Sequence, residues 1–232
     1  MAFLQHIPCP NCGSRDNLAE YTENYYCFGC GYTKQKNDLN SIRSRLSESR
    51  SSTMQSNEVN IKVINTIPQQ AAQWLLQYGI TKADIDEYKI GWCPDNNALV
   101  LVNTPNYWQG RNFGSYGAKY LSKGSKPLIF YGKGDILICV EDVISAIKIA
   151  KSNSNYIVTP LLGSVMSLEL TETILERFNK VFLWLDRDKA NEAVKQARNL
   201  KQKGVDIDVI ISPNDPKEYS TKEINEWLKS KY

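Results

Sequence analysis

The sequence predicts an α/β protein whose main sheet is mostly parallel and is covered by helices on both faces. From residue 136 onward, short apolar runs alternate with segments that have helical periodicity. The runs have the length and continuous apolar character of strands buried on both faces, and such βαβ alternation builds a parallel sheet. Ahead of this region we expect a small α+β subdomain, and at the N-terminus a cysteine-containing module with too few apolar residues to fold without a staple.

Changes in composition divide the 232 residues into five segments. Residues 38–58 are rich in serine and arginine and lack aromatic residues, which is typical of a flexible linker. Leu39, Ile42 and Leu46 nevertheless have the spacing of a short helix. The expected segments are the cysteine-bearing module (1–37), the linker (38–58), the α+β subdomain (59–134), the parallel-sheet subdomain (135–213) and a C-terminal helical segment (214–232).

Two short helices are expected at the start of the α+β subdomain. We place Pro68 in the first turn of one helix, which Gly79 ends, and Thr81 as the cap of another that ends before Gly91. The apolar residues 98–102 then predict a strand. In the parallel-sheet subdomain we expect strands at 136–140, 156–162, 181–185 and 205–211, and helices at 143–152, 168–178 and 189–203.

The bulk composition is that of an ordinary soluble globular protein, with 42% hydrophobic and 23% charged residues. No apolar stretch approaches the roughly 18 to 20 residues of a membrane span, and residues 1–10 lack the pattern of a signal peptide. We therefore expect an intracellular, cytoplasmic protein without a membrane partner. The net charge of +3 is too small to indicate nucleic-acid binding, so only the distribution of charge can do so.

The segment 105–134 combines five basic residues with seven aromatic residues and contains no acid. Basic side chains bind phosphates and aromatic faces stack on bases, so this mixture predicts a groove for single-stranded nucleic acid or nucleotide. The alternative is a solvated hairpin whose aromatic residues pack inward. The acidic residues that follow in the sequence favour the first interpretation.

Two Cys-x-x-Cys pairs lie near the N-terminus. Cys9 and Cys12 form the first pair and Cys27 and Cys30 the second, with 14 residues between the pairs. This spacing predicts one Zn²⁺ ion held tetrahedrally by four thiolates, and a closed site of this kind is structural. A redox-active pair is the alternative interpretation, which the presence of two pairs disfavours.

Acidic residues follow three of the expected strands at the points where the strands end. Glu141 follows the first, Asp186 and Asp188 follow the third, and Asp215 comes after the last. Because the carboxyl ends of parallel strands meet at one edge of a sheet, we expect these side chains to lie close together. Carboxylates gathered there raise one another's pKa unless a cation neutralises them, and oxygen ligands suit Mg²⁺ or Mn²⁺. The sequence therefore predicts a divalent-metal site.

These motifs resemble those of the Toprim-type primases, the DnaG-like bacterial enzymes, and most closely the primase half of the phage primase-helicases. The resemblance covers nearly the whole chain. It implies a Toprim fold for the parallel-sheet subdomain and a zinc ribbon for the N-terminal module. It rests on the cysteine knuckles at 7–14 and 27–30, the helical segment 74–94, the basic motif at 110–111 and 119–122, and the Toprim motifs at Glu141, 162–164, 186–190 and 215–216.

The chain departs from the family pattern at four positions: Asp142 replaces a usual glycine, Ser145 replaces a common aspartate, Arg187 lies between the two aspartates, and Lys217 replaces an acid that often follows the proline. These changes leave Glu141, Asp186 and Asp188 in place but weaken the case for a further carboxylate near Asp215. The sequence also lacks a Gly-x-x-x-x-Gly-Lys-Ser/Thr phosphate loop, so we expect no helicase activity from it.

The resemblance implies a DNA primase that synthesises short RNA primers on single-stranded DNA by two-metal nucleotidyl transfer. The implied catalytic residues, which also bind Mg²⁺ or Mn²⁺, are Glu141, Asp186 and Asp188. Asp215 is a further expected Mg²⁺ ligand, and Glu141 could instead assist proton transfer. The residues expected to bind nucleotide or template are Arg111, Lys119 and Lys189.

The implied partners are the single-stranded DNA template and ribonucleoside triphosphates, with a separate replicative helicase and DNA polymerase. A phage-infected host cell is the implied location. Two other classes stay open: a RecR-like recombination mediator that binds DNA without catalysis, and a Toprim nuclease that uses the same metals to cut DNA. A topoisomerase is disfavoured because the chain is too short for a strand-passing gate.

Overall fold

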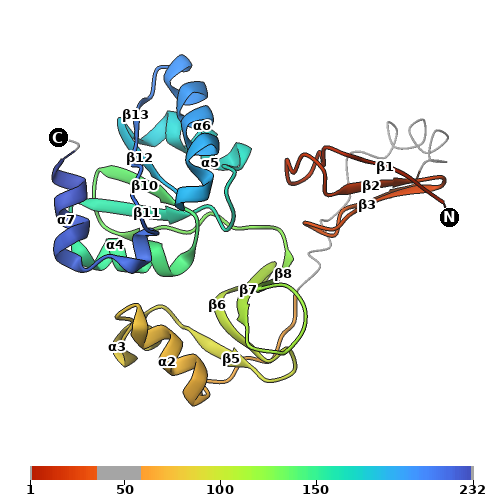
Figure 1. Ribbon diagram of the computed structural model, residues 1–232, viewed down its shortest axis with the longest axis horizontal. Helices are drawn as coiled ribbons and strands as arrows, with labels where there is room; N and C mark the ends of the chain where they lie inside the picture. The colour runs from red at the N-terminus through yellow and green to blue at the C-terminus, as the bar shows by residue number, and fades with distance from the viewer. Residues whose placement is uncertain (1, 36–58, 231–232) are drawn as a thin grey trace, which may run out of the picture.

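The protein is described here by a computed structural model, in which residues 2–35 and 59–230 are placed. The expected linker at 38–58 lies outside the described residues. The described chain contains an N-terminal four-stranded sheet, a second four-stranded sheet and a five-stranded sheet (Figure 1). Among the helices of these two ranges, none is both long enough and apolar enough to cross a membrane.

The N-terminal sheet is an antiparallel meander in the order β1-β2-β3-β4. Its buried cluster consists of Cys9, Leu18 and Cys27, so thiols form much of the interior of this module. So small an apolar interior does not stabilise a fold by itself, in agreement with the expected need for a staple. The strands are β1 (Phe3–Ile7), β2 (Leu18–Tyr21), β3 (Asn24–Cys27) and β4 (Thr33–Gln35).

The α+β subdomain begins with two short helices and continues as an antiparallel sheet in the order β5-β6-β7-β8. Thr81 caps the second helix through a reciprocal capping box with Asp84, as predicted. Pro68 is the N-cap of the first helix and not a residue of its first turn, which corrects its expected position. The elements are α2 (Gln69–Gln77), α3 (Lys82–Glu87), β5 (Gly91–Cys93), β6 (Ala98–Thr104), β7 (Tyr107–Asn112) and β8 (Tyr120–Gly124).

The five-stranded sheet has the order β13-β12-β10-β11-β9, and every pair in it is parallel except β11 with β9. The mainly parallel sheet that the sequence predicts is therefore present. Its strands are β9 (Tyr131–Gly132), β10 (Ile136–Val140), β11 (Tyr156–Pro160), β12 (Lys180–Trp184) and β13 (Asp206–Val209). Its helices are α4 (Val143–Ser152), α5 (Leu168–Arg177), α6 (Ala190–Gln202) and α7 (Thr221–Lys229).

Helices cover both faces of this sheet (Figure 1). Along β10, Leu137 and Cys139 pack in the cluster that contains α5 and α6 residues. Ile138 and Val140 pack in the opposite cluster with α4 and α7 residues. Both faces of the strand are buried, which explains why its sequence is apolar throughout and does not alternate.

The α+β subdomain and the parallel-sheet subdomain share an apolar core. Leu75 of α2 and Leu99 of β6 belong to the same buried cluster as Ile144 and Ile147 of α4. Asp84 of α3 also forms an ion pair with Lys151 of α4. These contacts fix the position of the carboxyl edge of the parallel sheet relative to β7 and β8.

The short strand β9 is not among the elements expected from the sequence, and the expected elements of this sheet differ from the observed ones at their ends. The expected helix at 189–203 begins at Ala190, because Arg187–Lys189 forms a 3₁₀ turn, η1, in which the Lys189 N–H donates to the Asp186 carbonyl oxygen. The strand expected at 205–211 is limited to Asp206–Val209. Beyond it a second 3₁₀ turn, η2 (Pro216–Glu218), leads into α7.

The sheet has a topological switch point between β10 and β12, which lie side by side. The chain leaves β10 through α4 on one face and leaves β12 through α6 on the other. Diverging connections of this kind open a crevice at the carboxyl ends of the two strands, which is where ligands bind in open α/β sheets.

Candidate functional site

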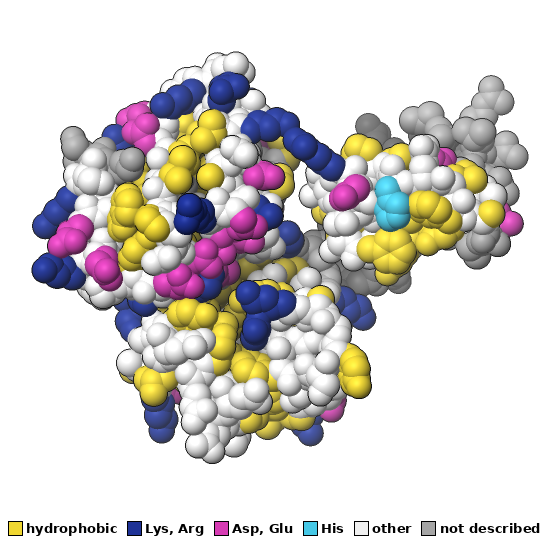
Figure 2. Space-filling model, in the orientation of Figure 1, with side chains coloured by type: hydrophobic (Ala, Val, Ile, Leu, Met, Phe, Trp, Pro, Cys, Tyr) yellow, Lys and Arg dark blue, Asp and Glu magenta, His cyan; other side chains and the backbone are white. Residues whose placement is uncertain are grey.

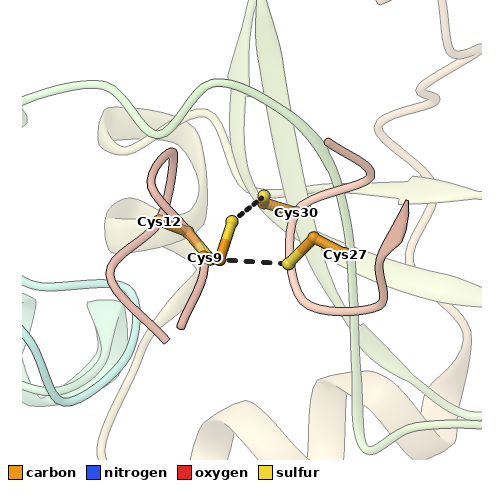
Figure 3. Close-up of side chains that lie close together, drawn as sticks. All are labelled: Cys9, Cys12, Cys27 and Cys30. Carbon is orange, nitrogen blue, oxygen red and sulfur yellow. Dashed lines mark hydrogen bonds between the residues drawn. The ribbon is translucent and has the colours of Figure 1, made fainter. Parts of the chain in front are cut away.

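The four paired cysteines gather at one end of the N-terminal sheet, with their side chains pointing toward one another (Figure 3). Their sulfur atoms all lie within 4.8 Å of one another. Cys9 Sγ is 3.8 Å from Cys30 Sγ, and Cys12 Sγ is 3.7 Å from Cys27 Sγ. With Zn–S bonds of about 2.3 Å, a tetrahedral site separates its sulfur atoms by roughly 3.8 Å. The cluster therefore fits one zinc ion, and all four thiols are free of disulfides.

Hydrogen bonds to the cysteines prepare part of this cluster for metal binding. Burial raises the pKa of Cys12 and Cys27, as expected for thiols that have no metal to stabilise their ionised form. At Cys30 burial is opposed by donors from Asn11 and from the Tyr32 backbone, which lower its pKa to about 7. Such N–H···S contacts also orient thiolates around a metal.

The second candidate site lies at the switch point of the parallel sheet. Glu141 directly follows β10, and Asp186 lies just beyond the end of β12 on the neighbouring strand. Asp142 is the N-cap of α4, and Asp215 is the N-cap of the turn η2. Figure 2 shows acidic side chains gathered in a band on this part of the molecule, with basic side chains beside it. The fold thus brings together acids from three separate loops.

Glu141 is partly buried, and its Oε2 atom has no hydrogen-bond partner within the described ranges. Burial raises the pKa of Glu141, and the negative charges of Asp188 and Asp142 raise it further. The ammonium groups of Lys189 and Lys217 act in the opposite direction. A buried carboxylate oxygen without a donor is costly, so this atom needs a proton or a cation.

Asp186 is in the same condition. Its Oδ1 atom is buried and has no partner among the placed residues. Burial raises the pKa of Asp186 to about 7 although the Lys217 ammonium lowers it, and the charges of Glu141 and Asp215 contribute in the same direction as burial. Glu141 and Asp186 therefore act on each other electrostatically across the crevice.

A divalent cation fits these two residues, because it is the partner that both oxygen atoms lack and because carboxylate oxygens suit Mg²⁺ and Mn²⁺. The four cysteines, however, are the only group of three or more potential ligands within 4.8 Å of one another in residues 2–35 and 59–230. Any three carboxylates of these residues therefore include ligand atoms more than 4.8 Å apart, a limit that applies to groups of three and not to the pair Glu141 and Asp186. A metal held by Glu141 and Asp186 would complete its coordination with water or phosphate oxygens.

Asp188 and Lys189 occupy the 3₁₀ turn η1 at the rim of the crevice. The Asp188 side chain is 72% exposed, and its Oδ2 lies 3.0 Å from Lys189 Nζ. Lys189 has a raised pKa because of this hydrogen bond and the charge of Asp188. The structure thus places both residues next to the acid cluster but pairs them with each other, which the sequence motif does not reveal.

Lys217 lies inside the acid cluster and is only 7% exposed. Its Nζ atom is 2.8 Å from Asp215 Oδ2, 2.9 Å from Asp142 Oδ2 and 3.5 Å from Asp186 Oδ2. In the sequence, Lys217 and Asp142 are only two separate departures from the pattern that the motifs resemble. Opposite charges at two unusual positions were the one indication of their contact.

Arg111 lies on β7 in the α+β subdomain. Its guanidinium carbon is 5.6 Å from the ring centroids of both Trp74 and Tyr120, a distance typical of cation–π contacts. Its Nε and Nη1 atoms are buried and have no hydrogen-bond partner in the described chain. Arg111 and Trp74 also line a groove of about 450 Å³ with three glutamines of α2 and residues 112–114. The Arg111 guanidinium can therefore donate hydrogen bonds to a phosphate oxygen.

Lys119 precedes β8 and is exposed, with its Nζ 5.9 Å from the Tyr120 ring centroid. Burial raises the pKa of Tyr120 to about 12, and the charges of Asp142, Lys217 and Arg111 also act on it. Tyr120 therefore lies close both to the acid cluster and to Arg111. The basic residues of β7 and β8 and the acids of the parallel sheet border one site.

No protein-family model matches the chain, and no curated protein matches it in sequence. Solved primase structures nonetheless have a similar fold. The zinc-binding and RNA polymerase domains of the Aquifex aeolicus primase align with a TM-score of 0.56 at 13% identity, over 99% of this chain and 80% of that chain. The primase fragment of the bacteriophage T7 primase-helicase protein aligns over 99% of both chains, with a TM-score of 0.51 and 16% identity.

A DNA primase domain from Pseudomonas aeruginosa aligns over 70% of both chains, with a TM-score of 0.52 and 17% identity. At identities this low, the likeness concerns the fold alone. It agrees with the mainly parallel sheet, the preceding α+β subdomain and the N-terminal cysteine cluster. The chain therefore has the fold of the Toprim-type primases.

Proposed function

We propose that this protein is a DNA primase that makes short RNA primers on single-stranded DNA by metal-dependent nucleotidyl transfer. The observation that carries the proposal is the pair of buried oxygens of Glu141 and Asp186 that have no hydrogen-bond partner in the described part of the chain, at the switch point of a primase-like fold. The guanidinium nitrogens of Arg111 on the neighbouring sheet, which likewise have no partner among the described residues, complement them. Carboxylates that can bind a metal ion, next to a guanidinium that can bind phosphate, suit a nucleoside triphosphate with its metal.

In this proposal Glu141 and Asp186 hold Mg²⁺ or Mn²⁺ in the crevice. Bound there, the metal supplies positive charge that neutralises the triphosphate and lowers the pKa of the attacking 3′-hydroxyl. Asp188 would add its negative charge to the same metal site from the rim, since its charge already raises the pKa of Glu141. Asp215 contributes less to metal binding than the sequence predicts, because its Oδ2 atom accepts a hydrogen bond from Lys217.

Arg111 and Lys119 would bind the triphosphate or the template backbone, while Trp74 and Tyr120 offer aromatic faces to bases. Arg111 suits this task because a planar guanidinium binds phosphate oxygens in pairs. Lys189 would join them only after its ion pair with Asp188 opens.

The zinc ribbon, proposed to comprise residues 1–37, would bind the template and hold it over the polymerase domain through the linker at 38–58. A DnaG primase catalytic domain bound to single-stranded DNA has a similar fold, with a TM-score of 0.53 and 15% identity. Ribonucleoside triphosphates are the proposed substrates. A separate replicative helicase and a DNA polymerase are the proposed partners, in the cytoplasm of a phage-infected cell.

The test is primer synthesis by the zinc-loaded protein on single-stranded DNA of varied sequence, with the four ribonucleotides and Mg²⁺. We expect short template-dependent RNAs, and we expect Asp186→Ala to abolish them while template binding persists. Lys201→Ala is the matched control, because Lys201 is an exposed residue of α6 whose ion-pair partner, Asp208 of β13, is not one of the proposed site residues.

Each other outcome selects a different function. DNA cleavage that needs Mg²⁺ but no nucleotides would replace the primase by a Toprim nuclease. Template binding without any RNA product, with or without an added helicase, would favour a RecR-like mediator. Normal RNA yield from Asp186→Ala would show that the metal site has been placed on the wrong residues.

A further inference from the structure

One cation is already built into the acid cluster. The Lys217 ammonium group donates to Asp215, Asp142 and Asp186 at 2.8, 2.9 and 3.5 Å, so three carboxylates surround it. The side chain is almost fully buried. A buried ammonium group needs carboxylates close to it to offset the loss of water, and Lys217 has three.

The position of Lys217 is fixed by the backbone around it. Pro216 and Asp215 start the 3₁₀ turn η2, and the Lys217 carbonyl oxygen accepts a hydrogen bond of 2.7 Å from Lys148 Nζ on α4. Asp142 is fixed as well, because as N-cap of α4 it accepts hydrogen bonds from Ser145 N at 2.9 Å and Ser145 Oγ at 3.1 Å. The ammonium group is therefore held in place before any ligand binds.

The two carboxylate oxygens of Asp186 have different surroundings. Its Oδ2 atom accepts from Lys217, while its Oδ1 atom is buried without a partner and is the atom that a metal would bind together with Glu141. Asp142 and Asp215 are both engaged by Lys217 through their Oδ2 atoms. Asp142 and Asp215 thus already share one cation, whereas among the described residues no ammonium group is hydrogen-bonded to the buried oxygens on the Glu141 side of Asp186.

We propose that the Lys217 ammonium occupies the second cation position of the acid cluster, so that this site binds one divalent metal, between Glu141 and Asp186, and not two. The proposal rests on the proposed metal-dependent function of the crevice. It replaces the two-metal site expected from the sequence by a metal–ammonium pair that shares Asp186. A second divalent ion placed among Asp142, Asp186 and Asp215 would coincide with the ammonium group.

The test is a count of Mn²⁺ ions bound by the zinc-loaded full-length chain, measured by electron paramagnetic resonance titration of free Mn²⁺. We expect one Mn²⁺ per wild-type chain and none for Glu141→Gln. Lys217→Met keeps most of the aliphatic stem but removes the charge, and it should bind two Mn²⁺ ions. Lys217→Arg, which keeps a cation, and Lys201→Met, which removes an exposed lysine elsewhere, should each bind one.

The outcomes separate this inference from the proposed function. Two Mn²⁺ ions on the wild-type chain, or one on a folded Lys217→Met variant, would overturn the role of Lys217 and leave the metal site standing. No Mn²⁺ on the wild-type chain would overturn the metal site itself. If Lys217→Met does not fold, as judged by circular dichroism, the wild-type and Lys217→Arg counts still decide, because two ions on either would contradict a built-in cation.

Discussion

Oε2 of Glu141 and Oδ1 of Asp186 are the atoms on which the proposed chemistry most directly depends. Both are buried without a hydrogen-bond partner in the part of the chain that the structure places. Burial raises the pKa of both side chains. A carboxylate in this condition takes up either a proton or a cation, so the metal-free and the metal-bound protein should respond differently to pH.

In the metal-free protein, Asp186 should make stability depend on pH. Its pKa in the folded state is about 7, above the 3.8 of an ordinary aspartate. The stabilisation is therefore complete below pH 3.8 and is lost as pH rises through about 7, since ionisation is easier in the unfolded chain. Thermal unfolding should show a falling melting temperature for wild type relative to Asp186→Asn over this range, amounting to several degrees.

Excess Mn²⁺ provides the control for this prediction, because a bound cation stabilises the ionised carboxylate. With Mn²⁺ the fall of the melting temperature at rising pH should disappear in wild type, whereas the melting temperature of Asp186→Asn should change little. If the melting temperatures of the two metal-free proteins change with pH in the same way, Asp186 ionises like an exposed aspartate.

At this scale the sequence predicts some residues of the site and misses the contacts between them. Glu141 and Asp186 were predictable, because acids that directly follow apolar strands must lie at the carboxyl edge of a parallel sheet. The pairing of Lys217 with Asp142 joins residues 75 positions apart. Only the packing of η2 against the start of α4 brings them together, and no local pattern encodes that packing.

Among the elements, burial decides which ones the sequence predicts. β10 and β12 are buried on both faces, so their residues form continuous apolar runs that are visible in the sequence. β9 contains two residues and β1 is almost wholly exposed, so neither has a pattern strong enough to predict it. Lys189, the last residue of η1, falls in the expected helix because it is helix-compatible; only the hydrogen bonds of the turn identify it as 3₁₀.

The helix α3 depends on one buried carboxylate. Asp84 Oδ2 accepts from the Thr81 backbone N–H at 2.6 Å and from Thr81 Oγ1 at 2.7 Å, and it also pairs with Lys151 of α4. Burial raises the pKa of Asp84, but the hydrogen bonds from Lys151 and Thr81 outweigh this effect and lower it. The same group thus completes the capping box of α3 and links the α+β subdomain to the parallel-sheet subdomain.

Asp84→Ala should lower the free energy of unfolding by about 1 to 2 kcal/mol, because it removes the carboxylate half of the capping box and the ion pair with Lys151. Urea denaturation measures this loss, with Asp86→Ala, an exposed position in the same helix, as the control. The Asp84 contribution is present above pH 3.8 and is lost as pH falls through the lowered pKa. An equal, small effect of both variants would refute the role of Asp84.

The whole molecule combines a cysteine cluster that fits zinc with a proposed metal site of different chemistry. The four thiolates of the N-terminal module match one zinc ion, whose role is structural because all four ligands come from the protein. The carboxylate crevice instead leaves coordination positions for water or substrate. The interior of the module consists largely of its own cysteines, whereas the parallel sheet and the α+β subdomain have apolar cores independent of it. Loss of zinc should therefore unfold the module alone.

This independence predicts a division of labour that can be measured. Deletion of residues 1–37, or removal of zinc by a chelator followed by restoration of Mg²⁺, should reduce initiation at preferred template sites at least tenfold. Extension of a supplied RNA primer should fall much less, because Glu141, Asp186 and Arg111 all lie outside the module. Restoring zinc to the chelated protein should recover initiation. Equal losses in both reactions would mean that the module supports the fold or the chemistry of the crevice, and not the choice of template.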